Sequence, residues 1–326
     1  MIAIDGGDTS DAAASELGRV VARFGQRYIV ALDARPGASG APNAGPNPAE
    51  AHEVDAVARG RHMDVVVGDR VRCSRERELH VIESVQARRN LLFRSDANRT
   101  KPLAANVDQI AIVFATQPPP QKEFVWRALL AARSASIESM AILNKIDLES
   151  SGALVILEDI SALGGRVLRV SARSDPDGTR EILRQQCAAR ATLFVGQSGM
   201  GKSTLLNLLI DADVRTGALS RRGTHGRQTT TATRWFAYGS DAAVIDSPGF
   251  HEFGLAHLPA AQLIQWMPEF AAVDQPCRFA DCRHAEEPGC RIRQAVAQGA
   301  ISAERYAFYR KLCAQEIEQR RAERGF

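Results

Sequence analysis

The sequence predicts an α/β protein in three parts: a small β-barrel, a central domain of alternating strands and helices, and a C-terminal helical domain. Three observations support this prediction. Short strand patterns fill residues 17–101, strands and helices alternate through residues 102–254, and three cysteines and a histidine cluster within residues 255–326. Residues 1–16 are small and polar without periodicity, so we expect a disordered tail there.

Strand patterns in the first region favour a barrel of the OB type. Alternating apolar residues predict a hairpin at 18–25 and 27–32, and further strands at 64–72 and 80–85. Several short strands in so short a stretch are typical of a small closed barrel. Residues 34–51 are rich in Pro, Gly, Ala and Asn and predict a loop of this barrel.

Basic residues outnumber acidic ones within the barrel region, although the whole chain carries a formal charge of only +3. Several crowd the end of this region, at Arg88, Arg89, Arg94, Arg99 and Lys101. Arginines on a small barrel suit phosphate contact and base stacking, which predicts an RNA-binding surface. An ordinary solvated surface explains the same charges equally well.

In the central region the alternation of strands and helices predicts a doubly wound sheet. Strands are expected at 110–115, 140–143, 166–170, 192–195 and 242–245, and helices at 123–133, 153–163 and 178–190. Such folds bind ligands at the carboxyl ends of their strands. Polar residues that directly follow a strand are therefore the candidates for a site.

The strand at 192–195 leads into a phosphate loop. Gly196, Gly201, Lys202 and Ser203 match the pattern G-x-x-x-x-G-K-[ST], and leucines at helical spacing follow. The glycines let backbone N–H groups surround a phosphate at a helix N-terminus. Lys202 is expected to reach the β- and γ-phosphates, and the Ser203 hydroxyl to coordinate Mg²⁺. The rest of the predicted binding loop consists of Gln197, Ser198, Gly199, Met200 and Thr204.

A second motif, Asn144-Lys145-Ile146-Asp147, follows the strand at 140–143 and indicates recognition of guanine. The Asp147 carboxylate can accept hydrogen bonds from the guanine N1–H and exocyclic amine, which adenine cannot supply. The alkyl stem of Lys145 can cover the base. Ser171-Ala172 follows the next strand, where the Ala172 N–H could donate to the guanine O6. The alternative is a strand-end turn with a solvated Lys–Asp pair.

Two more segments supply candidates for metal binding and catalysis. Gly226-Arg-Gln-Thr-Thr-Thr contains Thr230, which is expected to bind Mg²⁺ and close over the γ-phosphate. Asp246-Ser-Pro-Gly249 follows a strand. Asp246 can hold Mg²⁺ through water, and the Gly249 N–H can touch the γ-phosphate. The expected cofactor of the nucleotide site is therefore Mg²⁺ with GTP, bound directly by Ser203 and Thr230.

The cysteines of the last region form a candidate metal site. Cys277, Cys282, His284 and Cys290 make a closed Cys₃His set within a short stretch, which predicts one structural zinc. The alternative is a group of reduced, buried thiols. Ser302 then caps a helix to about residue 321, with Tyr306, Tyr309, Leu312 and Ile317 on its apolar face. No signal peptide and no membrane-spanning stretch is recognisable, so we expect a cytoplasmic protein without a membrane partner.

The order of the nucleotide motifs is unusual, because the base-reading motifs precede the phosphate loop. This order predicts a circularly permuted Ras-like P-loop GTPase domain. With a basic OB-type barrel before it and Cys-x₄-Cys-x-His-x₅-Cys after it, the chain resembles the small-ribosomal-subunit biogenesis GTPases called RsgA or YjeQ. Gly68-Asp-Arg-Val, Asn106-Val-Asp-Gln and Arg305-Tyr also resemble this family, and the likeness spans about residues 17–321.

The resemblance implies a GTPase that the small (30S) ribosomal subunit stimulates late in its maturation. It implies that the barrel, residues 17–101, and the zinc domain, residues 255–326, contact ribosomal RNA on either side of the GTPase domain, residues 102–254. Hydrolysis of GTP to GDP and phosphate would drive release, with another assembly factor as a further candidate partner. We expect the protein to act as a monomer.

The chain departs from the family pattern in two places, and one further position differs from Ras-like enzymes. Gln228 stands where the family usually has His before the three threonines, and residues 34–51 form an insertion. Phe250 follows Asp246-Ser-Pro-Gly249 where Ras-like enzymes carry the glutamine that orients the attacking water. Because Phe250 cannot bind water, slow intrinsic hydrolysis is expected. Gln228 is one candidate to replace that glutamine; an exposed switch residue or an RNA contact are the alternatives.

Two other functions remain open at this point. The chain could be an RNA-binding module whose nucleotide site is a relic, which the intact Lys202, Ser203 and Asp246 argue against. It could also be an ATPase or metabolite kinase on the same fold, which Asn144-Lys-x-Asp argues against.

Overall fold

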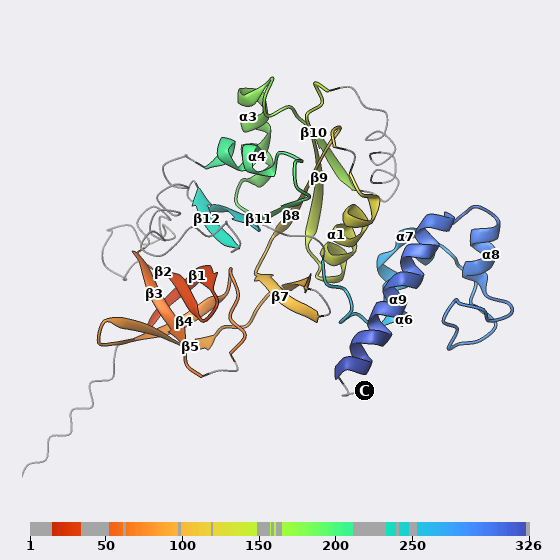
Figure 1. Cartoon of the computed structure of the whole chain (residues 1–326), viewed down its shortest axis with the longest axis horizontal. Coiled ribbons are helices and arrows are strands. Elements are labelled where there is room, and N and C mark those ends of the chain that lie inside the picture. The colour runs from red at the N-terminus through yellow and green to blue at the C-terminus, as the bar shows by residue number, and fades with distance from the viewer. Residues whose placement is uncertain are drawn as a thin grey trace, which may run out of the picture.

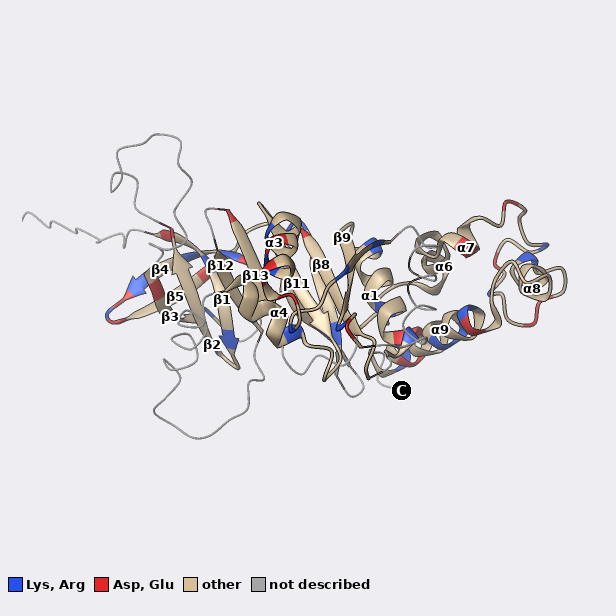
Figure 2. Cartoon of the chain, turned by 90° about the horizontal axis from the view of Figure 1, so that it is seen from above, with Lys and Arg blue, Asp and Glu red and all other residues tan. Residues whose placement is uncertain are grey.

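The computed structural model places three parts in a row: a barrel, a central sheet with helices, and a helical C-terminal part (Figures 1 and 2). The structure describes residues 15–33, 52–60, 63–96, 99–118, 120–148, 157, 160, 165–210, 233–238, 241–247 and 253–323.

Five strands form the barrel: β1 (Glu16–Phe24), β2 (Arg27–Leu32), β3 (His52–Ala58), β4 (Arg70–Glu76) and β5 (Leu79–Val85). They pair in the order β1-β2-β3-β5-β4, and β4 pairs again with β1, so the sheet closes on itself. Only β3 and β5 run parallel. Val20, Val30, Val71 and Ile82 fill the interior, since alternate residues of each strand point inward. The predicted OB-type barrel is confirmed.

The barrel differs from its prediction in detail. Strand β3 was not predicted, because only Val54 and Ala56 of its seven residues are buried and the polar His52, Glu53 and Asp55 obscure the alternation. At 64–72 a strand with a turn is predicted, and the strand itself, β4, begins only at Arg70. Before it, buried Val65–Val67 lead to a turn at Gly68, whose φ of +92° is accessible mainly to glycine.

The central sheet consists of β8 (Gln109–Ala115), β9 (Glu138–Asn144), β10 (Arg166–Arg169), β11 (Ala191–Gly196), β12 (Arg234–Tyr238) and β13 (Ala242–Asp246). Its order is β10-β9-β8-β11-β13-β12, and all neighbours are parallel except β12 and β13. From β8 the chain adds β9 and then β10 on one side of β8. After β10 it returns and adds β11 on the other side. Right-handed crossovers therefore place α1 (Lys122–Ser134) on one face, and α3 (Pro176–Cys187) and α4 (Lys202–Leu209) on the other.

Two unpredicted features join the barrel to this sheet. A hairpin, β6 (Leu91–Asp96) and β7 (Arg99–Ala105), lies between them in the chain. Strand β1 also pairs with β12, with Ala22 opposite Arg234, so the barrel and the central sheet share one hydrogen-bonded network. Most of the helix predicted at 153–163 lies outside the described residues.

The C-terminal part is helical, with α6 (Ala260–Leu263), η2 (Ile264–Trp266), α7 (Pro268–Ala271), α8 (Arg291–Ala297) and α9 (Ala303–Glu323). The predicted cap of α9 is present, since the Ser302 hydroxyl accepts a hydrogen bond from Arg305 N at 3.2 Å. Tyr309 and Leu312 are buried as expected, whereas Ile317 is 41% exposed. No helix in the described ranges is long and apolar enough to cross a membrane.

Candidate functional site

The predicted nucleotide-binding residues gather at one edge of the central sheet. Asn144 ends β9, Ser171 follows β10, the phosphate loop follows β11 and Asp246 ends β13. These strands run parallel, so their carboxyl ends meet at the same edge. Between β8 and β11 the strand order changes direction, which is where open α/β sheets form their binding crevice.

Asn144 joins three of these segments. Its side chain is buried, and its amide Nδ2 donates to Met200 O in the phosphate loop at 3.1 Å. Its Oδ1 accepts from Ala172 N at 3.1 Å. From the sequence, the Ala172 N–H is expected to donate to the guanine O6. A bound guanine would therefore compete with the Asn144 side chain for this N–H.

Gly201 allows this approach of the loop to β9. A Cβ atom there would lie 2.3 Å from Asn144 Nδ2, and the φ of Gly201 is +87°. Gly196 has a similar role, because its Cβ would lie 2.6 Å from Val113 O on the neighbouring strand β8. The two glycines of the motif are thus required by packing as well as by phosphate binding.

Lys145 and Asp147 present the base-reading groups at the surface. Lys145 Nζ donates to Gly199 O at 2.7 Å and to Gln117 O at 2.8 Å, which stretches its alkyl stem along the loop. The Asp147 carboxylate is exposed, and it accepts a hydrogen bond from the hydroxyl of buried Ser171. An oriented, accessible carboxylate beside an extended alkyl chain is suited to bind the edge and face of a purine.

Lys202 and Asp246 form an ion pair that the sequence did not predict. Their side chains are 12% and 9% exposed, and they bridge the start of α4 and the end of β13. The pair forms because β11 and β13 are neighbours, with Leu193 opposite Ile245. A bound phosphate with its metal ion would separate this ion pair, because Lys202 is expected to bind the phosphate and Asp246 to hold the metal ion.

The remaining loop residues differ in how the structure constrains them. Gln197 Oε1 accepts from Gln121 N at 3.0 Å, just before α1. Ser203 and Thr204 are exposed in the first turn of α4, and Ser198 is exposed before it. Gln228, Thr230, Gly249 and Phe250 lie outside the described residues, so their roles stay predictions.

The four predicted metal ligands come together in the C-terminal part. One donor atom from each of Cys277, Cys282, His284 and Cys290 lies within 4.8 Å of the others. His284 Nδ1 is 3.5 Å from Cys277 Sγ and 3.4 Å from Cys290 Sγ, and the two sulfurs are 4.0 Å apart. Tetrahedral zinc with bonds of about 2.3 Å to sulfur and 2.0 Å to nitrogen needs edges of about 3.5–3.8 Å. The donor set therefore fits a metal ion of this size.

Hydrogen bonds hold these ligands in place. Cys277 Sγ accepts from Arg291 N at 3.3 Å, and Cys290 Sγ accepts from Arg293 N at 3.5 Å at the start of α8. Burial raises the pKa of the Cys277 thiol, but hydrogen bonds from backbone N–H groups and neighbouring thiols outweigh it and lower the pKa overall. Tyr306 on α9 donates its hydroxyl to His284 O at 2.5 Å, which links the ligand loop to the long helix.

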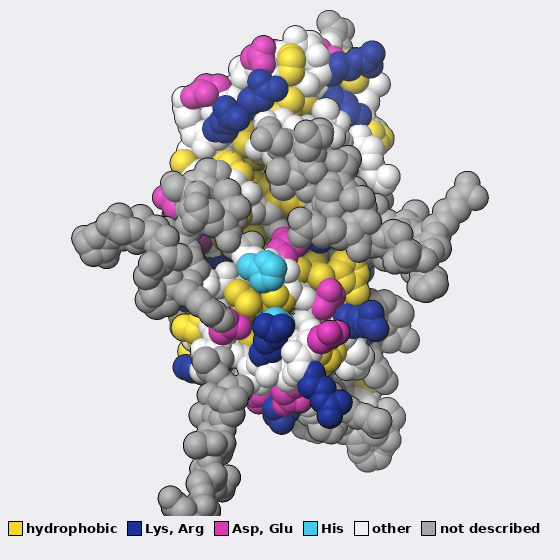
Figure 3. All heavy atoms as spheres, turned by 90° about the vertical axis from the view of Figure 1, so that its left-hand side faces the viewer, with side chains coloured by type: hydrophobic (Ala, Val, Ile, Leu, Met, Phe, Trp, Pro, Cys, Tyr) yellow, Lys and Arg dark blue, Asp and Glu magenta, His cyan; other side chains and the backbone are white. Residues whose placement is uncertain are grey.

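The structure changes the interpretation of the basic barrel. Arg88 pairs with Asp69 at 2.7 Å and Arg89 pairs with Asp108 at 2.6 Å, so both have structural partners. At the barrel end of the molecule, basic and acidic side chains are interspersed (Figure 3). A cavity of about 550 Å³ in the barrel is lined by Glu16, Asp33, Glu53, Asp55 and Glu78, together with His52, His80 and Arg75. Acidic side chains outnumber basic ones in this lining, although Asp33 pairs with Arg70 and Glu53 with Arg234, so the cavity does not favour an RNA backbone.

Comparison with known proteins identifies relatives over nearly the whole chain. A sequence model for the family described as RsgA GTPase matches residues 85–256. The chain is 42% identical over 299 residues to the small ribosomal subunit biogenesis GTPase RsgA of Burkholderia pseudomallei strain 668, covering 90% of each protein. It is also 42% identical over 301 residues to the protein of that name from Paraburkholderia phymatum, again covering 90% of each.

Two solved structures share the fold. The crystal structure of YjeQ from Thermotoga maritima aligns with a TM-score of 0.63 and 25% identity, covering 93% of this chain and 99% of that one. YloQ, described as a circularly permuted GTPase, aligns with a TM-score of 0.61 and 20% identity, covering 97% and 99%. The predicted permuted fold is confirmed.

Proposed function

We infer the function of this chain from one premise: it belongs to the RsgA family of GTPases and is a GTP-hydrolysing enzyme. We propose that it acts in the late maturation of the small ribosomal subunit, and that this subunit stimulates its turnover. The observation that carries the proposal is the 42% identity, over 90% of each protein, to relatives named small ribosomal subunit biogenesis GTPase RsgA. The convergence of Lys202, Asp246 and the Asn144–Asp147 motif at one edge of the sheet supports the nucleotide-binding part.

In the proposed reaction the loop backbone and Lys202 bind the phosphates of GTP. The Ser203 hydroxyl fits the oxygen ligands that Mg²⁺ requires, with Thr230 as the proposed second direct ligand, and the released Asp246 carboxylate would hold the ion through water. Bound Mg²⁺ would neutralise charge on the phosphates. Gln228 is the proposed group that orients the attacking water, because Phe250 cannot.

Preference for guanine is proposed to come from the second motif. Asp147, held by Ser171, would accept from the guanine N1–H and amine, while the Lys145 stem covers the base. Adenine presents an acceptor at N1, which would face the carboxylate unfavourably. This supports GTPase activity over the alternative of an ATPase or metabolite kinase.

Contact with ribosomal RNA is proposed for both ends of the molecule. The zinc domain exposes Phe279, 42% accessible, with the Arg278 guanidinium 5.4 Å from its ring centroid. An exposed aromatic ring beside an arginine suits stacking on an unpaired base. Beside the barrel, Arg94 in β6 is the better candidate, since Arg88 and Arg89 are paired and the barrel cavity is acidic.

We propose zinc as the metal of the Cys₃His cluster, with a structural role. Three thiolates and one imidazole leave no ligand position for water or substrate, which is the arrangement of structural zinc sites. The expected cytoplasmic location, monomeric state and second assembly factor stay predictions.

The decisive experiment measures GTP turnover by the full chain, with and without purified small ribosomal subunits, and with ATP as competitor. We expect slow turnover alone, at least tenfold faster turnover with subunits, and no competition by equimolar ATP. Turnover that subunits do not change would remove the ribosomal part of the proposal. Effective competition by ATP would remove the guanine assignment.

A further inference from the structure

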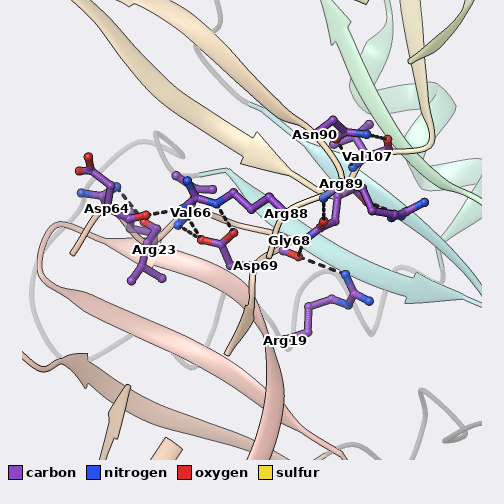
Figure 4. A network of polar contacts seen from close by, with 12 residues as sticks. Arg19, Arg23, Asp64, Val66, Gly68, Asp69, Arg88, Arg89, Asn90 and Val107 are labelled. Carbon is purple, nitrogen blue, oxygen red and sulfur yellow. Dashed lines mark hydrogen bonds and ion pairs between the residues drawn. The ribbon is translucent and has the colours of Figure 1, made fainter. Parts of the chain in front are cut away.

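Three segments that are distant in the sequence meet where the barrel joins the central domain (Figure 4). They are the barrel turn at 66–69, the linker at 88–90 and the segment at 106–108 that directly precedes β8. The nucleotide site uses none of these residues. Their polar side chains are nevertheless buried or paired with other groups, and buried polar groups need hydrogen-bond partners.

On the barrel side the turn is rigid. Asp69 is fully buried, and its carboxylate accepts from Val66 N at 2.8 Å and from two nitrogens of Arg88 at 2.7 and 2.9 Å. At Gly68 the backbone is so close to β7 that a Cβ atom would lie 2.0 Å from Ala105 O. The turn therefore cannot move independently of the linker and of β7.

Asn106 connects this turn to the linker. Asn106 is only 5% exposed. Its side-chain Nδ2 donates to Gly68 O at 3.0 Å, and its Oδ1 accepts from Arg89 N at 2.9 Å. The residue has a φ of +57°, which asparagine tolerates better than most residues. The buried amide of Asn106 thus adds to the Arg88–Asp69 pair a second connection between the barrel turn and the linker.

Asp108 connects the same segment to the strand that ends in the phosphate loop. Its Oδ2 accepts from Ala191 N at 2.8 Å, its backbone N donates to Ala191 O at 2.9 Å, and Oδ1 pairs with Arg89. Ala191 begins β11, all six residues of which are buried, and Gly196 at its other end begins the loop. A buried strand between two sheet neighbours moves as a unit.

We propose that Asn106 and Asp108 are positioning residues that couple the barrel to the phosphate loop through β11. The strength of the coupling comes from the buried groups, because Arg89 is 63% exposed and an exposed ion pair contributes little. Coupling between two sites is reciprocal, so nucleotide binding alters the barrel turn and a partner on the barrel alters the nucleotide site. The inference rests on the proposed function in one respect: the partner on the barrel is taken to be the small ribosomal subunit.

The first test needs no ribosome. Amide hydrogen exchange is followed in the full chain with and without a non-hydrolysable GTP analogue and Mg²⁺. We expect loading to slow exchange severalfold both in the phosphate loop and at Gly68 and Asp69. In Asn106→Gly, which accepts the same φ and lacks the side chain, slowing in the loop should persist and slowing in the turn should disappear.

Ser136→Gly is the matched control, because Ser136 also has a positive φ, of +55°, but is exposed in the turn after α1. It should behave as the parent chain does. If Asn106→Gly does not fold, Asp108→Ala breaks the other end of the same connection at a residue whose side chain is 29% exposed, and should give the same result. Loop protection without turn protection in the parent chain, or turn protection retained in the variants, would overturn the inference.

The second test measures the ratio of subunit-stimulated to basal turnover. Asn106→Gly should lower this ratio at least fivefold while binding of subunits and of GTP stays within twofold of the parent chain. If subunits do not stimulate the parent chain, only the proposed ribosomal function is refuted, because the exchange experiment tests the coupling independently. A parent chain whose phosphate loop gains no protection on loading would refute both.

Discussion

At the scale of single residues, the nucleotide site depends on side chains that hold backbone segments as much as on groups that face a ligand. Asn144 satisfies a carbonyl of the phosphate loop and an N–H group beside Ser171, and it is almost fully buried. Buried polar groups that lose their partner are costly, by about 1–3 kcal/mol each. Asn144 therefore fixes the relative positions of the phosphate and base subsites before any nucleotide binds.

The first prediction concerns Asp147. Asp147→Asn should weaken GTP binding by about 2–3 kcal/mol, or roughly 30- to 150-fold, because the charged acceptor for the guanine N1–H and amine is lost. Titration with a fluorescent GTP analogue measures this. Asp177→Asn, another exposed aspartate, on α3, is the control and should bind as the parent chain does. Unchanged affinity in Asp147→Asn would contradict the assignment of the base-reading residue.

The second prediction concerns Gln228. If its amide orients the attacking water, Gln228→Ala should lower subunit-stimulated turnover by about tenfold or more, equal to about 1.4 kcal/mol of barrier. GTP affinity should not change. Turnover equal to that of the parent chain would exclude a catalytic role, and loss of subunit binding would assign Gln228 to the RNA interface instead.

At the scale of elements, helix α9 attaches the metal-binding part to the central domain. Phe308 on α9 packs against Trp126 on α1 with tilted rings whose centroids are 5.5 Å apart, and Lys311 pairs with Glu123 at 2.8 Å. One turn before Phe308, the Arg305 guanidinium lies 4.7 Å from the Trp126 ring and pairs with Glu269 at 2.6 Å. A planar, charged guanidinium can lie on an aromatic ring and pair with a carboxylate at the same time, so an arginine suits position 305.

The third prediction follows from this contact. Arg305→Ala should lower the free energy of unfolding by about 2 kcal/mol, since it removes the stacking on Trp126 and leaves the partly buried Glu269 carboxylate without its partner. Chemical denaturation measures the effect. Lys311→Ala, which removes a more exposed partner of the same helix pair, should cost less than about 1 kcal/mol. Equal effects of the two substitutions would mean that the stacking contributes nothing.

The fourth prediction concerns the metal centre. Elemental analysis of the freshly purified chain should find one zinc per chain, and Cys282→Ser should reduce this content and make residues 277–290 susceptible to protease. Nucleotide binding should persist, because the phosphate loop belongs to a separate domain. Cys73→Ser, in the barrel, should keep its zinc and serves as the control. A parent chain with far less than one zinc would count against the site.

At the scale of the whole molecule, the three parts stand in a row with the nucleotide site in the middle one (Figure 2). Strand β12 pairs with the barrel and α1 packs on α9, so both ends have direct contacts with the central domain. The net charge of +3 is small, and many arginines are paired internally. The proposed binding of ribosomal RNA would therefore depend on local basic groups.

The fifth prediction is that subunit binding depends on salt. Raising monovalent salt from about 50 to 200 mM should weaken binding by roughly tenfold or more, as expected for the release of counterions from about three phosphate contacts. Filter binding or sedimentation measures this at each salt concentration. Phe279→Ala should also weaken binding, but the salt slope should stay the same because stacking releases no counterions. Salt-independent binding would exclude a phosphate interface.

The sequence predicted the barrel, the permuted nucleotide-binding domain and the metal cluster because each is marked by local chemistry. A phosphate loop needs glycines and a Lys-Ser pair at fixed spacing in one continuous loop, and a closed metal site needs four soft ligands close together. Strand β3 was missed because its polar residues hide the alternation, and β12 because its buried residues, which begin with Arg234, are consecutive and do not alternate with exposed ones. The domain limits themselves remain predictions.

Tertiary structure alone decided which distant groups meet. Lys202 and Asp246 pair across 44 residues, Asn106 reaches Gly68 across 38, and Arg88 binds Asp69 across 19. By sequence, Arg88 and Arg89 were as good candidates for RNA contact as any other basic residue. Arg88 is structural because the buried Asp69 carboxylate needs a partner, and which partner can reach it depends on how the strands are packed rather than on the local order of residues.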